Sequence, residues 1–180
     1  SCRKWSIPTS PPCSKAARKR DLALRPRFPI APPMPRIRLS TPADNARTIE
    51  IWRDAVDATH DFLTREDRIA IEEEVREFLP AAPLWLAIDA RDRPLGFMLL
   101  DGANMEALFI DPACRGRGIG RVLVEHALAL HASLTTDVNE QNARAVGFYE
   151  RMGFVRTGRS DRDGQGRAYP LIHLRHSPHG

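Results

Sequence analysis

Hydrophobic residues along this chain follow two spacings, one typical of helices and one typical of strands. Apolar positions three and four apart mark helices, and short apolar runs bounded by Gly, Pro or Asp mark strands. Strands are expected at about 36–40, 84–88, 95–100, 104–110 and 134–138, with two more after residue 153. Helices are expected from about residue 41 and over about 64–79, 119–131 and 141–152. Because strands, helices and hairpins alternate, the pattern predicts a mixed α/β (α+β) domain.

Polar residues mark the beginnings of two of these helices. Thr41 is expected to cap the first helix and Thr64 the second, because a side-chain oxygen at this position accepts a free backbone N–H. The apolar stripe expected on the second helix comprises Ile71, Val75, Phe78 and Leu79. Near the end of the chain, the Asp- and Gly-rich segment 158–166 is predicted to be the turn between the last two strands.

A glycine-rich segment lies between the strand at 104–110 and the helix that follows. Its sequence is Arg115-Gly116-Arg117-Gly118-Ile119-Gly120. The apolar stripe of the following helix comprises Ile119, Val122, Leu123, Ala127 and Leu130. Glycines let backbone N–H groups converge without a Cβ in the way, and a helix N-terminus attracts negative charge. The segment therefore predicts a site for a phosphate or pyrophosphate group, with an ordinary tight turn as the alternative.

The residues around these glycines distinguish between known phosphate motifs. A P-loop needs a lysine after its last glycine, and this chain has no lysine after Lys19. A dinucleotide-binding motif would read G-x-G-x-x-G in the first βαβ unit, whereas this segment reads G-x-G-x-G past the middle of the chain. The pattern R-x-x-G-x-G, formed by Arg115, Gly118 and Gly120, resembles the pyrophosphate loop of the GNAT superfamily of acetyl-CoA-dependent N-acetyltransferases.

A second segment, Asn142 to Phe154, resembles the other GNAT hallmark, N-x-x-A-x-x-F-Y-x-x-x-G-F. Asn142 and Tyr149 are seven residues apart, which places them two turns apart on one helix face. Gly153 is expected to end this helix, and Phe154 to begin the next strand. The alternative interpretation makes Tyr149 a core aromatic residue with its hydroxyl at the surface.

The resemblance covers about residues 36–175 and implies a GNAT fold, a central mixed, mostly antiparallel sheet of about seven strands flanked by four helices. It implies acetyl-CoA as co-substrate and no metal. The pantetheine arm would pair with the fourth strand, and the pyrophosphate would bind the glycine-rich loop. The cofactor-binding residues it implies are Leu108, Phe109, Ile110, Arg115, Gly116, Arg117, Gly118, Ile119, Gly120, Arg121, Asn142 and Tyr149.

The reaction that the resemblance implies is direct attack of an amine on the thioester. Tyr149 is the expected general acid, since a phenol stays protonated at neutral pH, and a backbone N–H near Phe109 would stabilise the oxyanion. Three candidates for the general base are Asp137, Glu106 and His60, and a water chain could replace them. His60, in the loop after the first helix, and Phe62 are expected on the acceptor side. Cys114 is expected to be a packing residue rather than a nucleophile.

Charge divides the chain into two parts. Residues 1–33 carry a net charge of +7 and the remainder −3. The first part is rich in Pro and Ser and shows no apolar period, so we expect a disordered leader at 1–33 and the acetyltransferase domain at 34–177. A transit peptide, a basic arm for nucleic acid, or a non-native segment could account for the leader. We favour the third, because Met34 directly precedes the first expected strand.

These properties also bound the function. Cys114 is the single cysteine of the expected domain, which suits a reducing cytoplasm, and no apolar run approaches the length that spans a membrane. The primary expectation is an N-acetyltransferase acting on a small-molecule or peptide amine, with a homodimer as one possible assembly. The alternatives are an acyltransferase with another donor and a non-catalytic acyl-CoA sensor, which would not need Tyr149. A nucleic-acid binder is disfavoured by the negative charge of the domain.

Overall fold

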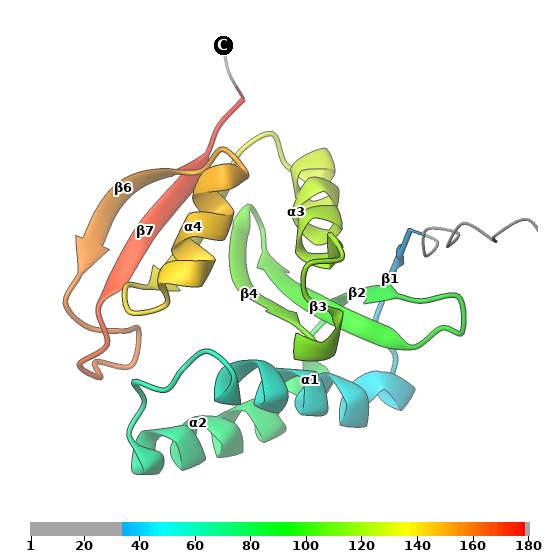
Figure 1. The fold of residues 1–180 in the computed structure, drawn as a ribbon, viewed down its shortest axis with the longest axis horizontal. Helices are drawn as coiled ribbons and strands as arrows, with labels where there is room; N and C mark the ends of the chain where they lie inside the picture. The colour runs from blue at the N-terminus through cyan, green and yellow to red at the C-terminus, as the bar shows by residue number, and fades with distance from the viewer. Residues whose placement is uncertain (1–33, 179–180) are drawn as a thin grey trace, which may run out of the picture. The chain divides into compact units, whose positions relative to one another are not determined.

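The computed structural model describes residues 34–178, in which seven strands form one sheet in the order β1-β2-β3-β4-β5-β7-β6 (Figure 1). All neighbouring strands are antiparallel except β4 and β5. The strands are β1 Arg36–Leu39, β2 Trp85–Ile88, β3 Pro94–Asp101, β4 Asn104–Ile110, β5 Leu134–Asn139, β6 Val155–Ser160 and β7 Leu171–His176. The mixed, mostly antiparallel sheet of seven strands is confirmed. The leader expected at 1–33 lies outside the described residues.

Four α-helices accompany the sheet: α1 Asn45–Asp57, α2 Arg65–Phe78, α3 Ile119–Leu130 and α4 Ala143–Arg151. The prediction for α2 is confirmed at its start, where the Thr64 hydroxyl accepts the backbone N–H of Asp67. The first helix begins later than expected, because a 3₁₀ turn over Pro42–Asp44 precedes α1. No helix among residues 34–178 is long and apolar enough to cross a membrane.

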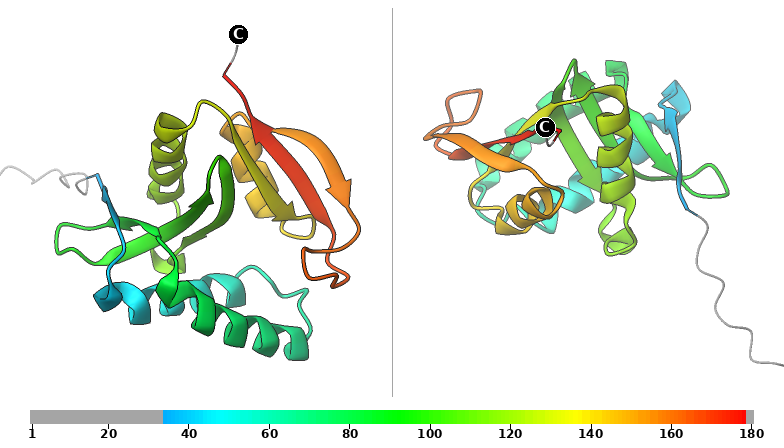
Figure 2. Two further views of the ribbon diagram at one scale, coloured as in Figure 1. Left: turned by 180° about the vertical axis from the view of Figure 1, so that it is seen from behind. Right: turned by 90° about the horizontal axis from the view of Figure 1, so that it is seen from above.

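Two hydrophobic cores lie on opposite faces of the sheet, and alternate residues of β3 separate them. Phe97 and Leu99 pack with α1 and with the apolar side of α2. Met98 and Leu100 pack with α3 and α4 on the other face. Figures 1 and 2 show α1 and α2 together on one side of the sheet, with α3 and α4 on the other.

Three details of the sequence-based prediction were wrong. Phe78 and Leu130, the last residues of α2 and α3, were expected on apolar stripes but are 56% and 48% exposed, and beside Phe78 it is Leu79 that packs into the core. The turn between the last strands begins later than expected, since β6 runs past Gly158 to Ser160 and pairs there with β7. The buried residues instead include Ile51 and Ala55 of α1, which the sequence analysis did not name.

The β4–β5 pair is short and opens into a gap. The two strands pair only at Asn104 with Thr135 and at Met105 with Thr136. A β-bulge follows, because Leu99 of β3 lies opposite Ala107 while Leu100 lies opposite Met105, which leaves Glu106 as the extra residue. From Glu106 onward, the side of β4 that faces β5 therefore has no strand partner within residues 34–178.

Candidate active site

The open end of the β4–β5 pair leads into a cavity of about 550 Å³. It is bounded by the end of β4, the glycine-rich loop, α4, and the C-terminal end of α1 with the loop after it. Twelve residues expected at the site line this cavity: His60, Leu108, Phe109, Ile110, Arg115, Gly116, Gly118, Ile119, Gly120, Arg121, Asn142 and Tyr149. Glu106, Asp137, Arg117 and Phe62 are not among the lining residues.

The glycine-rich loop has the backbone shape that an anion cradle requires. Gly116 and Gly118 have φ angles of 74° and 78°, which favour glycine, and a Cβ at either position would meet nothing within 4 Å. Gly118 precedes α3, and the first N–H to reach a carbonyl one turn back belongs to Val122, which donates to Gly118 O at 3.0 Å. The amides of residues 116–121 are therefore free for a ligand.

Asp111 holds the start of the glycine-rich loop in place. Asp111 follows β4, accepts the N–H of Ala113 at 2.8 Å and forms an ion pair with Arg47 of α1. Arg47 also donates to the carbonyl of Pro94 at 3.2 Å, so the pair ties α1 to both central strands. Burial alone would raise the pKa of Asp111, but the Ala113 N–H and the Arg47 guanidinium hold it below its usual value. Asp111 is therefore ionised and holds the start of the loop in place.

Arginines give the cavity a positive charge. Arg115, Arg121, Arg144 and Arg151 line it, and no acidic partner within residues 34–178 lies within 4 Å of Arg115, Arg144 or Arg151. Burial and the nearby positive charge of Arg144 lower the pKa of Arg115, despite the opposing effect of Asp111. Arg115 is partly buried, and a guanidinium group without a carboxylate partner is suited to phosphate oxygens, so this end of the cavity fits the pyrophosphate of coenzyme A.

The free edge of β4 forms one wall of the cavity. Asp111, directly after β4, donates its N–H to Leu95 O of β3 at 2.9 Å. The backbone groups of alternate residues in a strand point to the same side, so those of Phe109 also face β3. The peptide groups of Leu108 and Ile110 consequently face the opening. The sequence-based prediction placed the oxyanion donor near Phe109. Because the bulge at Glu106 sets which residues of β4 face the opening, the free N–H groups belong to Leu108 and Ile110, the two neighbours of Phe109.

Tyr149 lies on α4 and Asn142 directly before it, and both line the cavity. Tyr149 is 5% exposed, and its hydroxyl donates to Met105 Sδ at 3.5 Å, a soft and weak acceptor. Burial raises the pKa of this hydroxyl well above its usual value, despite a hydrogen bond with Thr136, so Tyr149 is protonated at neutral pH. Asn142 precedes α4, and its side-chain oxygen accepts the N–H of Ala145 at 3.1 Å, which leaves its amide nitrogen for the cavity.

The two carboxylate candidates for the general base lie outside the cavity lining. Asp137 of β5 is exposed and pairs through Oδ1 with His173 Nδ1 of β7 at 2.6 Å, and His173 Nε2 lies 2.7 Å from Ser160 Oγ of β6. Glu106, in the bulge, is exposed and accepts a hydrogen bond from Asn104. Both side chains are occupied by neighbours on the sheet.

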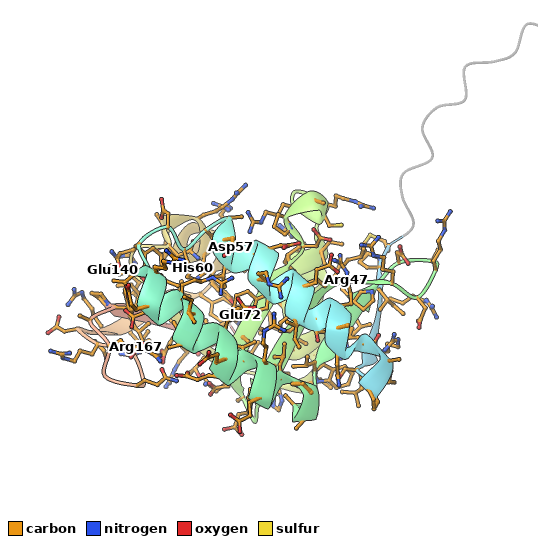
Figure 3. All side chains as sticks on the ribbon, turned by 90° about the horizontal axis from the view of Figure 1, so that it is seen from below. Arg47, Asp57, His60, Glu72, Glu140 and Arg167 are labelled. Atoms are coloured by element: carbon orange, nitrogen blue, oxygen red, sulfur yellow. The ribbon has the colours of Figure 1, made fainter. Side chains whose placement is uncertain are left out.

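The loop after α1 brings His60 to the cavity, while Phe62 packs beside it. His60 lies just beyond the end of α1 (Figure 3), and its ring centroid is 5.2 Å from that of Phe62. Phe62 in turn contacts Tyr169 with ring centroids 6.0 Å apart. Phe62 therefore supports the loop that carries His60.

Sequence reasoning missed several cavity residues. They are Ala55 and Thr59 near the end of α1, Cys114 before the loop, and Arg144, Ala145, Phe148 and Arg151 on α4. The spacing of Asn142 and Tyr149 was no signal for Arg144 and Arg151, because positions two residues apart point to nearly opposite sides of a helix. Thr59 and Ala55 had no signal either, since only tertiary packing brings α1 against the loop. Residues 34–178 contain no cluster of three metal-binding side chains.

Comparison with known proteins places this site in a family. A family model described as "Acetyltransferase (GNAT) domain" matches residues 80–156. The chain is 58% identical over 138 residues to the peptidyl-lysine N-acetyltransferase YjaB of Salmonella typhimurium, across 77% of this chain and 95% of that protein. It is 57% identical over 138 residues to the protein of the same name from Escherichia coli, across 77% of this chain and 94% of that protein.

Solved structures agree with this assignment. The solution structure of apo-form YjaB from Escherichia coli has a TM-score of 0.75 and 56% identity, and the match covers 78% of this chain and 95% of that one. The PaiA N-acetyltransferase from Thermoplasma acidophilum, crystallised with coenzyme A, shares the fold with a TM-score of 0.63 at 19% identity, across 77% and 96% of the chains. This chain belongs to the GNAT superfamily and is an acetyl-CoA-dependent N-acetyltransferase.

Proposed function

We propose that this enzyme acetylates the side-chain amine of a lysine in a peptide or protein. The support is the identity of 58% and 57% to two peptidyl-lysine N-acetyltransferases, over nearly their whole length. The observation that carries the proposal is that one cavity brings together a phosphate cradle, a free strand edge and a protonated tyrosine. These three features suit the pyrophosphate, the pantetheine arm and the leaving sulfur of acetyl-CoA in that order.

In this proposal the backbone positions the thioester and stabilises the charge that develops on it. The pyrophosphate binds the free amides of residues 116–121 and the guanidinium of Arg115, which forms no ion pair within residues 34–178. The pantetheine arm pairs with the peptide groups of Leu108 and Ile110, as an added strand would. One of these N–H groups donates to the oxyanion of the tetrahedral intermediate.

Tyr149 is proposed as the general acid. Its hydroxyl remains protonated at neutral pH because burial raises its pKa. It donates to Met105 Sδ, a weak acceptor, so transfer of that hydrogen bond to a thiolate, which is a stronger acceptor than a thioether, is favourable. Tyr149 then protonates the departing sulfur.

The acceptor class can be tested by measuring the release of free coenzyme A. Three matched peptides are needed: one with a blocked N-terminus and a single lysine, the same peptide with arginine in place of the lysine, and a lysine-free peptide with a free N-terminus. We expect release only with the first. Release with the third peptide alone, or only with small amines, would contradict lysine as the acceptor.

For Tyr149→Phe, we expect kcat to fall by about 100-fold, the lower range for losing a positioned general acid. The affinity for acetyl-CoA should change little, because the lost hydrogen bond goes to a sulfur within the protein. The matched control is Tyr169→Phe, which alters the one other tyrosine of the chain, outside the cavity lining. Equal turnover by wild type and Tyr149→Phe would refute the assignment.

A further inference from the structure

The cavity contains one side chain that can accept a proton near neutral pH. Its lining includes four arginines, a tyrosine with a raised pKa and a buried cysteine, but no aspartate or glutamate. His60 is the remaining titratable residue, and its ordinary pKa is close to neutrality. An amine that enters this cavity as an ammonium therefore meets His60 as the available base.

Hydrogen bonds around His60 determine which ring nitrogen carries the proton. The Thr59 hydroxyl donates its single proton to the carbonyl of Ala55 at 2.7 Å. Thr59 Oγ1 also lies 2.8 Å from His60 Nδ1, so it must accept at this contact, and Nδ1 must carry a hydrogen. The neutral ring therefore has its lone pair on Nε2, which has no hydrogen-bond partner among the described residues.

The surroundings favour this neutral form. Burial lowers the pKa of His60, and the positive charges of Arg115, from the loop before α3, and Arg68, from α2, act in the same direction. The carbonyl of Val56 at the end of α1 and the charge of Asp61 act against them, but the net pKa remains below the ordinary value. At neutral pH His60 is consequently an unprotonated base.

We propose that His60 is the general base of this enzyme and that its Nε2 removes a proton from the acceptor ammonium. This rests on the proposed function, since it assumes an amine acceptor in this cavity. Asp137 and Glu106, the rival candidates, lie outside the lining and are paired with His173 and Asn104. Arg115 and Arg68 keep the ring neutral, and Thr59 directs the lone pair away from α1.

The protons balance as follows. His60 Nε2 takes one proton from the ammonium, and the neutral amine forms a bond to the thioester carbon. The carbon–sulfur bond then breaks, Tyr149 gives its proton to the sulfur, and Tyr149 recovers a proton from the new amide nitrogen. His60 finally releases the first proton to water. One acetyl group moves, one proton leaves, and no further reactant is needed.

The test compares His60→Asn with Asp137→Asn and Glu106→Gln. Asparagine can still donate to Thr59 from the position of Nδ1, but it has no basic nitrogen. We expect kcat of His60→Asn to fall by at least about 100-fold at neutral pH, with unchanged acetyl-CoA affinity. The gap should narrow as the pH approaches the pKa of lysine, about 10.4, where the free amine needs no base. Asp137→Asn and Glu106→Gln should each stay within about twofold of wild type.

Several outcomes would overturn the proposal. A large loss in Asp137→Asn or Glu106→Gln with little loss in His60→Asn would assign the base elsewhere. A loss in His60→Asn that is the same at every pH would show a purely structural role. His60→Ala gives an independent measurement, because added imidazole should restore part of its activity, and no restoration would count against the base. All variants are assayed with whichever amine the wild type acetylates, so a wrong acceptor class does not affect this comparison.

Discussion

Asp44 shows how single residues make this fold sensitive to pH. Its side chain is almost completely buried before α1, where it accepts two hydrogen bonds from Arg38, at 2.8 and 3.0 Å, and two from Thr41. The hydrogen bonds from Arg38 are the main cause of a pKa of about 2, which is reached despite the opposing effect of burial. The ionised form is therefore favoured in the folded state over the unfolded state.

Replacing Asp44 by asparagine should consequently destabilise the enzyme at neutral pH. A carboxyl group with a lowered folded pKa stabilises the fold above its unfolded pKa, and the benefit is lost as the pH falls from about 4 to about 2. We expect the free energy of unfolding of Asp44→Asn to be lower by about 2 kcal/mol at neutral pH, with a smaller difference near pH 3. Urea unfolding at both pH values checks this, with Asp54→Asn, an exposed change on α1, as control. A difference independent of pH would contradict it.

Residue chemistry could be predicted from the sequence only where the contacts are local. Gly116, Gly118 and Tyr149 were found because each belongs to a short motif on one loop or one helix. Our proposal of His60 rather than Asp137 as the base depends on the Thr59–Ala55 hydrogen bond and on packing between distant elements, which no spacing in the sequence encodes. The same holds for the bulge at Glu106, which decides which amides of β4 face the cavity.

At the scale of elements, β3 and β4 approach unusually closely beside the site. A Cβ on Gly96 would lie 2.6 Å from Ile110 Cδ1 and 2.9 Å from the carbonyl oxygen of Phe109. The side chain of Ile110 can move, but the Phe109 oxygen belongs to the backbone of β4. This glycine therefore sets the position of the strand that lines the cavity.

Gly96→Ala should affect both the fold and the site. We expect a loss of about 1–3 kcal/mol in the free energy of unfolding, the usual cost of overpacking. Acetyl-CoA should also bind more weakly, because Phe109 and Ile110 line the cavity. Thermal unfolding and a binding titration measure the two effects. Gly164→Ala is the control, since a Cβ there would meet nothing within 4 Å. Unchanged acetyl-CoA affinity would show that β4 does not shift.

Sequence patterns predicted these elements better than their ends. The order of strands and helices follows from apolar spacing, and Thr64 marks the start of α2 through a local hydrogen bond. The end of β6 could not be read, because Gly158 resembles a turn residue, and only pairing with His173 keeps it in the strand. Likewise, nothing local shows that Leu79, and not Phe78, packs into the core.

At the scale of the whole described domain, ion pairs join the elements on the α1–α2 side, whereas a short junction joins the two halves of the sheet. On the α1–α2 side, Glu72, which Figure 3 labels, forms ion pairs with Arg53, Arg68 and Arg76. On this same side, Arg167, in the segment between β6 and β7, pairs with Glu74 of α2. The sheet itself is continuous except at β4 and β5, where two residue pairs and the side-chain bonds of Thr135 and Thr136 join its halves.

Because this junction is short, we expect acetyl-CoA to act as a structural support as well as a donor. A pantetheine arm along β4 would fill the gap between the two halves, and a ligand at 100 times its Kd adds about 2.7 kcal/mol to stability. We expect amides of β4 and β5 to exchange hydrogen more slowly in the complex, and amides of β1 and β2 to change little. Uniform protection across the sheet, or none at β5, would contradict this.

If that expectation holds, the lifetime of the enzyme would be linked to the supply of its own substrate. When acetyl-CoA is scarce, the gap between β4 and β5 would stay unfilled, and proteases that attack transiently opened chains would gain access there. When acetyl-CoA is abundant, the same chain would resist them. The amount of acetyltransferase would in this way follow the metabolic state on which its reaction depends.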